Sequence, residues 1–340
     1  MYCDTRIGGC QQWYVGDPPP ECSMRIPDDI RKCVVFLGYR NAAGDFKFAG
    51  TAFFLGRVTE DKILGFRYLV TARHVIDSIR SKGLQQVMLR TNRQDGTSEW
   101  FSTNADAWLG HPDGPSSDVS VMLLPNTFPW EQLDHRWYPI DGSATPDVIA
   151  KLSIGAGEEV FTIGLFHQHI GKRKNIPIVR VGNIAAMPEE PIPTSIGPID
   201  AFLVESRSIS GLSGSPVFTH LGPSRTVGGQ VLVSPIPEGT FYLLGQVFGH
   251  FDERDDPDAL VEDAAGGTKK INVGIAIVVP VMKILETLRQ PRIANQEAKA
   301  EQKRREEKGP TPDSLGDADF TKADFEAALK KVSRKIEPKV

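Results

Sequence analysis

Three short segments of the sequence hold side chains that could together break an acyl bond. His74 closely follows the apolar run LVTA, Asp118 begins the alternating run DVSVMLL, and Ser213 lies between glycines in GLSGSPVF. A serine hydroxyl is too weakly acidic to attack a carbonyl carbon unaided, so it needs a base within hydrogen-bonding reach. A histidine can supply that base when a carboxylate holds its other ring N–H. The three residue types predict a hydrolysis that starts with attack by Ser213.

The glycines around Ser213 suit the same chemistry. Gly211 lets the backbone turn so that its own N–H and that of Ser213 can point at one spot. Two such donors would form an oxyanion hole, and the loss of one donor costs about 3–4 kcal/mol in enzymes where it has been measured. Gly214 has no Cβ and permits a close approach of other backbone beside Ser213.

Other polar residues compete for these roles or suggest different chemistry. Asp113 could replace Asp118 as the orienting carboxylate, but Asp118 is favoured because it directly begins an alternating strand. His167 and His169 are two positions apart, so a strand would place both on one face, where metal binding is conceivable. No third ligand lies near them in the sequence, and we interpret them as polar loop residues. We therefore expect no metal site.

The elements that would position these residues are short strands. Between about residues 33 and 280, β-branched and aromatic runs alternate with Gly, Pro, Asn and Asp, which predicts an all-β sandwich or barrel rather than strand–helix–strand units. A looser stretch at about 139–157 divides the runs into two sets. We expect one barrel at about 30–140 and a second at about 155–280, followed by a closing helix at 281–289 with apolar residues at helical spacing.

The two ends of the chain differ from this body. Residues 1–29 include the run DPPP and are expected to be a flexible lead-in. Residues 291–340 hold 22 charged side chains, or 44%, and are expected to form a charged linker and a short amphipathic helix at 321–336. That helix would dock on a partner or pack back on the body. The cysteines lack the tight pair of a zinc site, and a cytosolic chain would keep them reduced; they are Cys3, Cys10, Cys22 and Cys33.

Composition excludes several classes of function. The chain has 340 residues, and its 39 basic and 43 acidic side chains nearly cancel to a net charge of −4, so no general field would draw it to nucleic acid or to an anionic membrane. No apolar run reaches the roughly 18 residues needed to span a bilayer. The first residues lack the basic start and apolar stretch of a secretory signal, which leads us to expect a cytoplasmic protein.

Taken together and in order, the three segments resemble the trypsin-like (chymotrypsin-fold) serine peptidases, in particular bacterial-type members. TARHV is similar to the T-A-x-H segment of that family, DVSV to its aspartate-and-strand segment, and GLSGSP to its G-x-S-G-[GS]-P segment. The resemblance covers roughly residues 30–290. It implies two antiparallel β-barrels with a cleft between them, and a catalytic triad of His74, Asp118 and Ser213. It also implies an oxyanion hole formed by the N–H groups of Gly211 and Ser213, with no metal or cofactor.

The sequence departs from the family pattern at positions that bear on activation and specificity. Leu212 stands where zymogen-activated members have an aspartate, so that mode of activation is not expected. Arg207 precedes Ser213 by six residues, where the family has the floor of its specificity pocket, and would favour an acidic substrate side chain unless it turns outward or pairs with an acid. His250 falls on the expected substrate-aligning strand. The acidic insertion 252–263 could cover the cleft, recruit a basic partner or be a solvated loop.

These observations predict a serine-type endopeptidase that acts on a protein or peptide substrate through an acyl-enzyme. An α/β-hydrolase is not favoured, because its G-x-S-x-G turn would need a glycine at the position of Ser215. Two alternatives remain. The chain could be a non-catalytic trypsin-fold module that binds extended peptides along a strand edge. It could also be a peptidase that is switched on by a partner docked at the helix 321–336.

Overall fold

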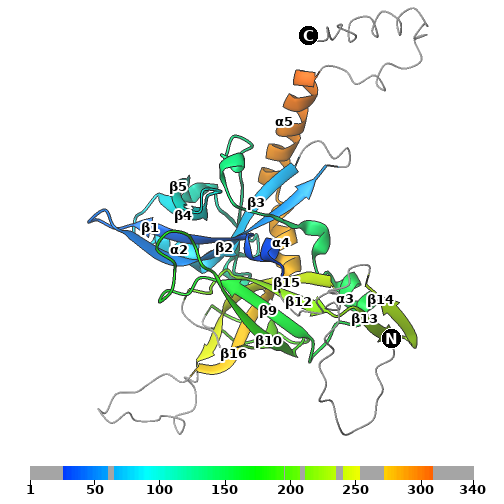
Figure 1. Cartoon of the computed structure of the whole chain (residues 1–340). Coiled ribbons are helices and arrows are strands. Elements are labelled where there is room, and N and C mark those ends of the chain that lie inside the picture. The colour runs from blue at the N-terminus through cyan, green and yellow to red at the C-terminus, as the bar shows by residue number, and fades with distance from the viewer. Residues whose placement is uncertain are drawn as a thin grey trace, which may run out of the picture. The chain divides into compact units, whose positions relative to one another are not determined.

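A computed structural model describes six segments of the chain, namely residues 26–59, 65–194, 196–206, 211–234, 240–252 and 272–308. The chain divides into two compact units, Met1–Gln290 and Pro291–Val340. The first unit contains all the described strands, and Figure 1 shows them in two groups. We call the group from β1 to β8 the sheet lobe and the group from β9 to β16 the barrel lobe.

The sheet lobe is an eight-stranded sheet with the order β5-β4-β1-β2-β3-β7-β6, in which neighbours are antiparallel. Strand β8 adds a short parallel pairing with β2. The strands are β1 (Val34–Arg40), β2 (Phe46–Val58), β3 (Gly65–Ala72), β4 (Gln86–Asn92), β5 (Ser98–Asn104), β6 (Leu109–Gly110), β7 (Val119–Leu123) and β8 (Tyr138–Pro139).

The barrel lobe closes by hydrogen bonding in the order β10-β11-β16-β15-β12-β9. A separate hairpin, β13 (Ser224–Val227) with β14 (Gln230–Val233), lies outside the barrel. The barrel strands are β9 (Glu159–Gly164), β10 (Ile178–Ala186), β11 (Phe202–Glu205), β12 (Pro216–Leu221), β15 (Thr240–Asp252) and β16 (Asn272–Pro280).

The expectation of two closed barrels is therefore confirmed for one strand set and not for the other. The two edge strands of the sheet, β5 and β6, are consecutive in the chain, and the 3-10 turn η1 (Ala105–Ala107) connects them. Strand β6 has only two residues, and both pair with β7. So short a strand has too few N–H and C=O groups to form a second ladder. The turn η1, rather than a row of hydrogen bonds, connects the two edges.

Helices are few in the described residues, and none is long and apolar enough to cross a membrane. In the body, α4 (Val281–Leu288) packs against β7 of the sheet lobe and β15 of the barrel lobe. Its buried residues include Val281, Ile284 and Leu288, as its spacing indicated. The second unit is described as α5 (Pro291–Lys308), whereas 321–336 lies outside the described residues. The other helices are α1 (Asp28–Arg31), α2 (Arg73–Arg80) and α3 (Pro146–Leu152), with 3-10 turns η2 (Gly114–Ser116), η3 (Trp130–Gln132) and η4 (Ile140–Gly142).

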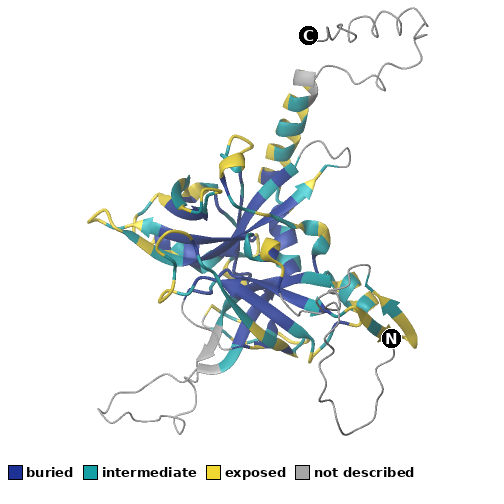
Figure 2. Ribbon diagram, in the orientation of Figure 1, coloured by how far each residue is buried: buried dark blue, intermediate teal, exposed yellow. Residues whose placement is uncertain are grey.

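Each lobe has its own hydrophobic core, which appears dark blue in Figure 2. In the sheet lobe, Phe54, Leu69 and Trp108 are almost fully buried. In the barrel lobe, Val204, Val217 and Leu244 have no measurable exposure. Alternating residues of each strand supply these cores, which is the pattern that the sequence showed.

A substitution in the barrel core should reveal how far the fold depends on it. Leu244→Ala removes a fully buried side chain from β15, and we expect it to lower the free energy of unfolding by about 2–5 kcal/mol. Val233→Ala, at a side chain that is 74% exposed on the outer hairpin, should change it by less than about 0.5 kcal/mol. Urea unfolding of both variants tests this, and equal effects would contradict the assigned core.

Candidate active site

One strand pairing brings His74 and Asp118 together. Strand β3 ends at Ala72 and continues directly into α2, in which His74 is the second residue. Strand β7 begins at Val119, immediately after Asp118, and Val119 pairs with Ala72. The register of two adjacent strands therefore places the histidine and the carboxylate side by side.

The carboxylate of Asp118 holds His74 with two hydrogen bonds. The His74 Nδ1 and Asp118 Oδ2 atoms are 2.7 Å apart, and the backbone N–H of His74 donates to Oδ1 at 2.8 Å. Asp118 is 2% exposed, whereas the His74 side chain is 41% exposed. An ionised carboxylate only accepts, so the bond to Oδ2 keeps a proton on Nδ1 and leaves Nε2 of a neutral ring free to accept one. This is the orientation that a general base requires.

The segment around Asp118 is itself fixed from both lobes. The backbone carbonyl of Asp118 accepts from the side chain of Gln246 at 2.7 Å and from the N–H of Arg73 at 3.2 Å. Gln246 lies on β15 and is fully buried. A barrel strand thus helps to hold a carboxylate that belongs to the sheet lobe.

Ser213 lies next to this pair without a hydrogen bond to it. Its hydroxyl donates to the carbonyl of Phe248 at 3.4 Å. Among the described residues, no hydrogen bond joins Ser213 Oγ to the ring of His74. The ring of Phe248 also contacts His74 edge to face, with centroids 5.8 Å apart. Phe248 therefore borders both side chains. Catalytic hydrogen bonds are often long or misaligned in unliganded proteins, so the arrangement is compatible with a nucleophile and its base.

The loop that carries Ser213 is held by backbone hydrogen bonds to both lobes. Gly214 N–H donates to Val247 of β15 at 2.8 Å, and the carbonyl of Ser213 accepts from Thr51 of β2 at 3.0 Å. Gly214 has φ +82°, and a Cβ there would collide with the backbone of Thr51 and the hydroxyl of Thr71. The expected close approach beside Ser213 is therefore present.

Gly211 adopts the left-handed backbone that the oxyanion turn was expected to need, with φ +102°. No described residue accepts a hydrogen bond from the N–H of Gly211 or of Ser213. A Cβ on Gly211 would lie within 3 Å of the ring of His167. His167 thus borders the turn, and burial lowers the pKa of its imidazole. Within the described residues, His167 and His169 join no cluster with metal-binding geometry.

Thr51 is a residue of this site that the sequence did not single out. It is fully buried on β2, and its hydroxyl donates to Gly211 O at 2.8 Å while accepting from Leu165 N–H at 2.9 Å. Its backbone carbonyl accepts from the Thr71 hydroxyl at 2.7 Å. One side chain of the sheet lobe therefore satisfies two backbone groups of the barrel lobe beside the candidate nucleophile. In the sequence, Thr51 is only one β-branched residue of the strand-like run GTAFFLG.

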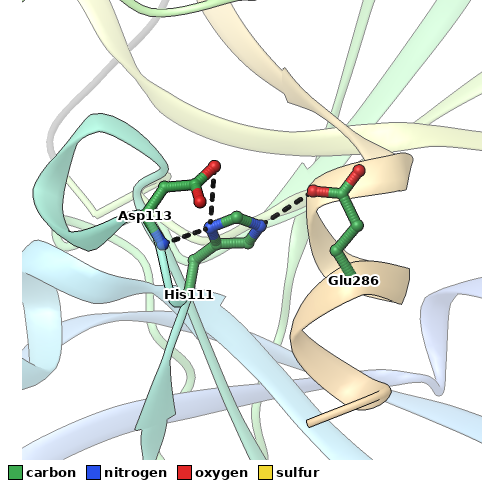
Figure 3. Close-up of side chains that lie close together, drawn as sticks. All are labelled: His111, Asp113 and Glu286. Carbon is green, nitrogen blue, oxygen red and sulfur yellow. Dashed lines mark hydrogen bonds and ion pairs between the residues drawn. The ribbon is translucent and has the colours of Figure 1, made fainter.

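Asp113, the alternative orienting carboxylate, belongs to a different cluster (Figure 3). Its N–H donates to Nδ1 of His111 at 3.1 Å, so the proton of a neutral His111 lies on Nε2 and is donated to Glu286, 2.9 Å away. The Lys283 ammonium lies 3.4 Å from Asp113 and 3.3 Å from Glu286. Burial lowers the pKa of Lys283, but its bonds to Glu286 and Asp113 outweigh this effect and raise it.

Because Lys283 already supplies the positive charge, we interpret this cluster as an ion-pair network and not as a cation site. Glu286 and Lys283 belong to α4, whereas His111 and Asp113 belong to the segment that leads to Asp118. The network therefore ties the helix to that segment.

Several sequence predictions fall on parts of the chain that the structure does not describe. Arg207 lies outside the described residues, as do Cys3, Cys10, Cys22 and nearly all of the acidic insertion 252–263. The backbone of His250 is described on β15, opposite Ala276. Cys33 is buried with a free thiol, and burial raises its pKa to about 12.

Comparisons with known proteins give only distant structural likenesses. No protein-family model matches the chain, and no curated protein matches it. Similar solved structures include the MamO protease domain from Magnetospirillum magneticum (13% identity, 77% of this chain and 98% of that one, TM-score 0.44) and Deg5 (16%, 76% and 88%, 0.40). Another is Rv3671c from M. tuberculosis H37Rv in an inactive form (17%, 76% and 86%, 0.38).

The contribution of Thr51 can be measured through stability. Thr51→Val keeps the shape but leaves Gly211 C=O and Leu165 N–H buried without their partner. Each such group costs about 1–3 kcal/mol, so the two together should lower the free energy of unfolding by about 2–6 kcal/mol. Thr51→Ser keeps the hydroxyl and should lose only about 1 kcal/mol. Urea unfolding compares the two, and a valine variant as stable as the serine variant would contradict the bridging role.

Proposed function

We propose that the protein is a serine endopeptidase in which Ser213 is the nucleophile, His74 the general base and Asp118 the residue that orients His74. The observation that carries the proposal is the pair of hydrogen bonds, 2.7 and 2.8 Å, by which the buried Asp118 holds His74 beside the Ser213 loop. A buried carboxylate is costly unless it is paired, and here its partner is a half-exposed histidine that leaves one ring nitrogen free.

The first half of the proposed reaction makes an acyl-enzyme. Ser213 Oγ attacks the carbonyl carbon of a peptide bond while its proton passes to Nε2 of His74. Asp118 stabilises the imidazolium that results. The negative charge on the carbonyl oxygen is bound by the N–H groups of Gly211 and Ser213. His74 then gives its proton to the leaving amine, and the C–N bond breaks.

In the second half, water takes the place of the amine. His74 accepts a proton from the water, which attacks the ester carbon, and the same proton then returns to Ser213 Oγ as the acid leaves. The cycle consumes one water for each peptide bond and returns every protein group to its starting state. Before the first step the Ser213 side chain must turn from Phe248 O toward His74. Side-chain rotations of this kind take picoseconds to nanoseconds and are no obstacle to turnover.

A second candidate function is a peptide-binding module without catalysis. The observation that favours it is the hydrogen bond from Ser213 Oγ to Phe248 O, which gives the hydroxyl an acceptor other than His74. Such a module would bind an extended peptide along a strand edge, such as that of β15. It would have no need of the double hydrogen bond between Asp118 and His74, and for this reason the endopeptidase is the stronger candidate.

Labelling with a fluorophosphonate, which reacts with an activated serine, tests the proposal. We expect the native chain to be labelled and Ser213→Ala not to be labelled, because the reactive oxygen is gone. Asp118→Asn should lower the labelling rate by as much as about 10⁴-fold, since the histidine would lose its correct tautomer. Intact-mass spectrometry of timed reactions measures both effects.

The matched control is Ser215→Ala, two residues away. Ser215 is fully buried, and its hydroxyl has no hydrogen-bond partner among the described residues, so its loss should leave labelling intact. Labelling that persists in Ser213→Ala would contradict the assignment of Ser213 as the nucleophile. A native chain that is folded yet unlabelled and cleaves no peptide would favour the binding module.

A further inference from the structure

A groove of about 770 Å³ opens between the sheet lobe and a loop of the barrel lobe. One wall is aromatic and belongs to the sheet lobe, with Phe46 and Phe48 from β2 and Trp100 from β5. The opposite wall is the segment 168–172 together with Ile176. Arg90 joins the two walls, because its guanidinium on β4 donates to the carbonyls of Gly171 at 3.0 Å and Lys172 at 3.1 Å.

The aromatic wall faces away from the core of the sheet lobe. Phe101 and Ala49 pack on that core, so the alternating neighbours Trp100 and Phe48 point to the opposite face of the sheet. The rings of Phe46 and Trp100 stack with centroids 4.4 Å apart and planes within 3° of parallel. All three rings are only partly buried. Half-exposed aromatic rings lining a cavity are typical of surfaces that bind another molecule.

The charge of the groove is of one sign. Its charged lining residues are Arg90 and Lys172, and none of the described lining residues is acidic. Lys172 and His169 are exposed. The protein as a whole has a net charge of −4, so this local excess of basic groups is not a general property of the chain. An occupant with an apolar side chain and neighbouring carboxylates would complement the groove in shape and in charge.

Both walls of the groove continue directly into the candidate active site. Along β2, Phe48 is three residues from Thr51, and three residues of a strand span about 10 Å. The N–H of Thr51 donates to Ser213 O. The loop wall follows His167, which borders Gly211. An extended peptide would span the interval between Ser213 and the aromatic rings with about three residues.

The direction of the peptide follows from where the leaving amine must be. That amine takes its proton from His74, so the substrate after the cleaved bond leaves on the His74 side of Ser213. A Cβ on Gly50 of β2 would lie within 3.2 Å of both Ser213 and Val75, the residue next to His74. Strand β2 therefore leaves the site on that side and leads to Phe48 and Phe46.

We propose that this groove binds the part of a substrate polypeptide that follows the cleaved bond. It selects an aromatic or aliphatic side chain at about the third residue after the bond, with acidic residues beside it. The inference rests on the proposed endopeptidase function and names the class of its substrate: a polypeptide that combines an apolar and an acidic character on the leaving side.

The test compares fluorescence-quenched peptides that share a cleavable sequence, found with a peptide library, before the bond. After the bond they carry either tryptophan or serine at the third position, flanked by aspartates or by lysines. We expect the native chain to cleave the tryptophan–aspartate peptide at least tenfold better, in kcat/KM, than the serine–lysine peptide.

Three variants test which residues cause this preference. Lys172→Glu should reverse the preference between aspartate and lysine flanks. Phe46→Ala should remove the preference for tryptophan. The control Val58→Ala, at an exposed position far along β2, should keep both preferences.

Equal cleavage of all peptides by the native chain would contradict the proposed role of the groove in substrate selection. An unchanged charge preference in Lys172→Glu would contradict it as well. Failure of the proposed function looks different, because then no peptide is cleaved, including a short chromogenic substrate that has no residue after the bond. In that case the anisotropy of a dye-labelled tryptophan–aspartate peptide decides. If the peptide binds Ser213→Ala and binding weakens at least fivefold when Lys172→Glu is added, the proposed role of the groove is supported. If the peptide does not bind Ser213→Ala, that role is contradicted.

Discussion

The arrangement of the candidate site depends on the hydrogen bonds of Thr51 across the boundary between the two lobes. Ser213 and Gly211 belong to the barrel lobe and His74 to the sheet lobe, so any shift between the lobes would separate the proposed nucleophile from the proposed base. Thr51 bonds to Ser213 through its backbone and to Gly211 through its hydroxyl, and it is buried where water cannot compete. Glycines at 50 and 214 make this contact possible, because a Cβ at either would press on the opposing lobe.

The parts of the site that could be predicted from the sequence lie next to the ends of neighbouring strands. His74 follows β3 and Asp118 precedes β7, so the single pairing of Ala72 with Val119 makes them neighbours. The tight turn at Gly211 and Gly214 could also be predicted, because glycine is the residue that tolerates positive φ. The all-β body followed from alternating runs bounded by turn residues.

The parts that could not be predicted depend on contacts between distant residues. Thr51 looks like any β-branched residue in a strand, and its partners Gly211 and Leu165 are 160 and 114 positions away. Likewise, nothing local connects His111 with Glu286, 175 positions later. The predicted closure of the first strand set was not confirmed, for a similar reason. Closure depends on the length of β6, and hydrophobic alternation says little about where a strand ends.

The burial of Cys33 has a consequence for how the protein meets oxidants. Cys33 directly precedes β1 and is 1% exposed. Its backbone carbonyl accepts a hydrogen bond from the N–H of Phe54. Because burial raises its pKa to about 12, it stays protonated at physiological pH, and only a thiolate reacts readily with peroxides, disulfides or alkylating agents. Burial and protonation therefore protect Cys33 from oxidation in the folded protein. The partly exposed hydroxyl of Ser213 would be open to an electrophile, while this buried sulfur stays inert.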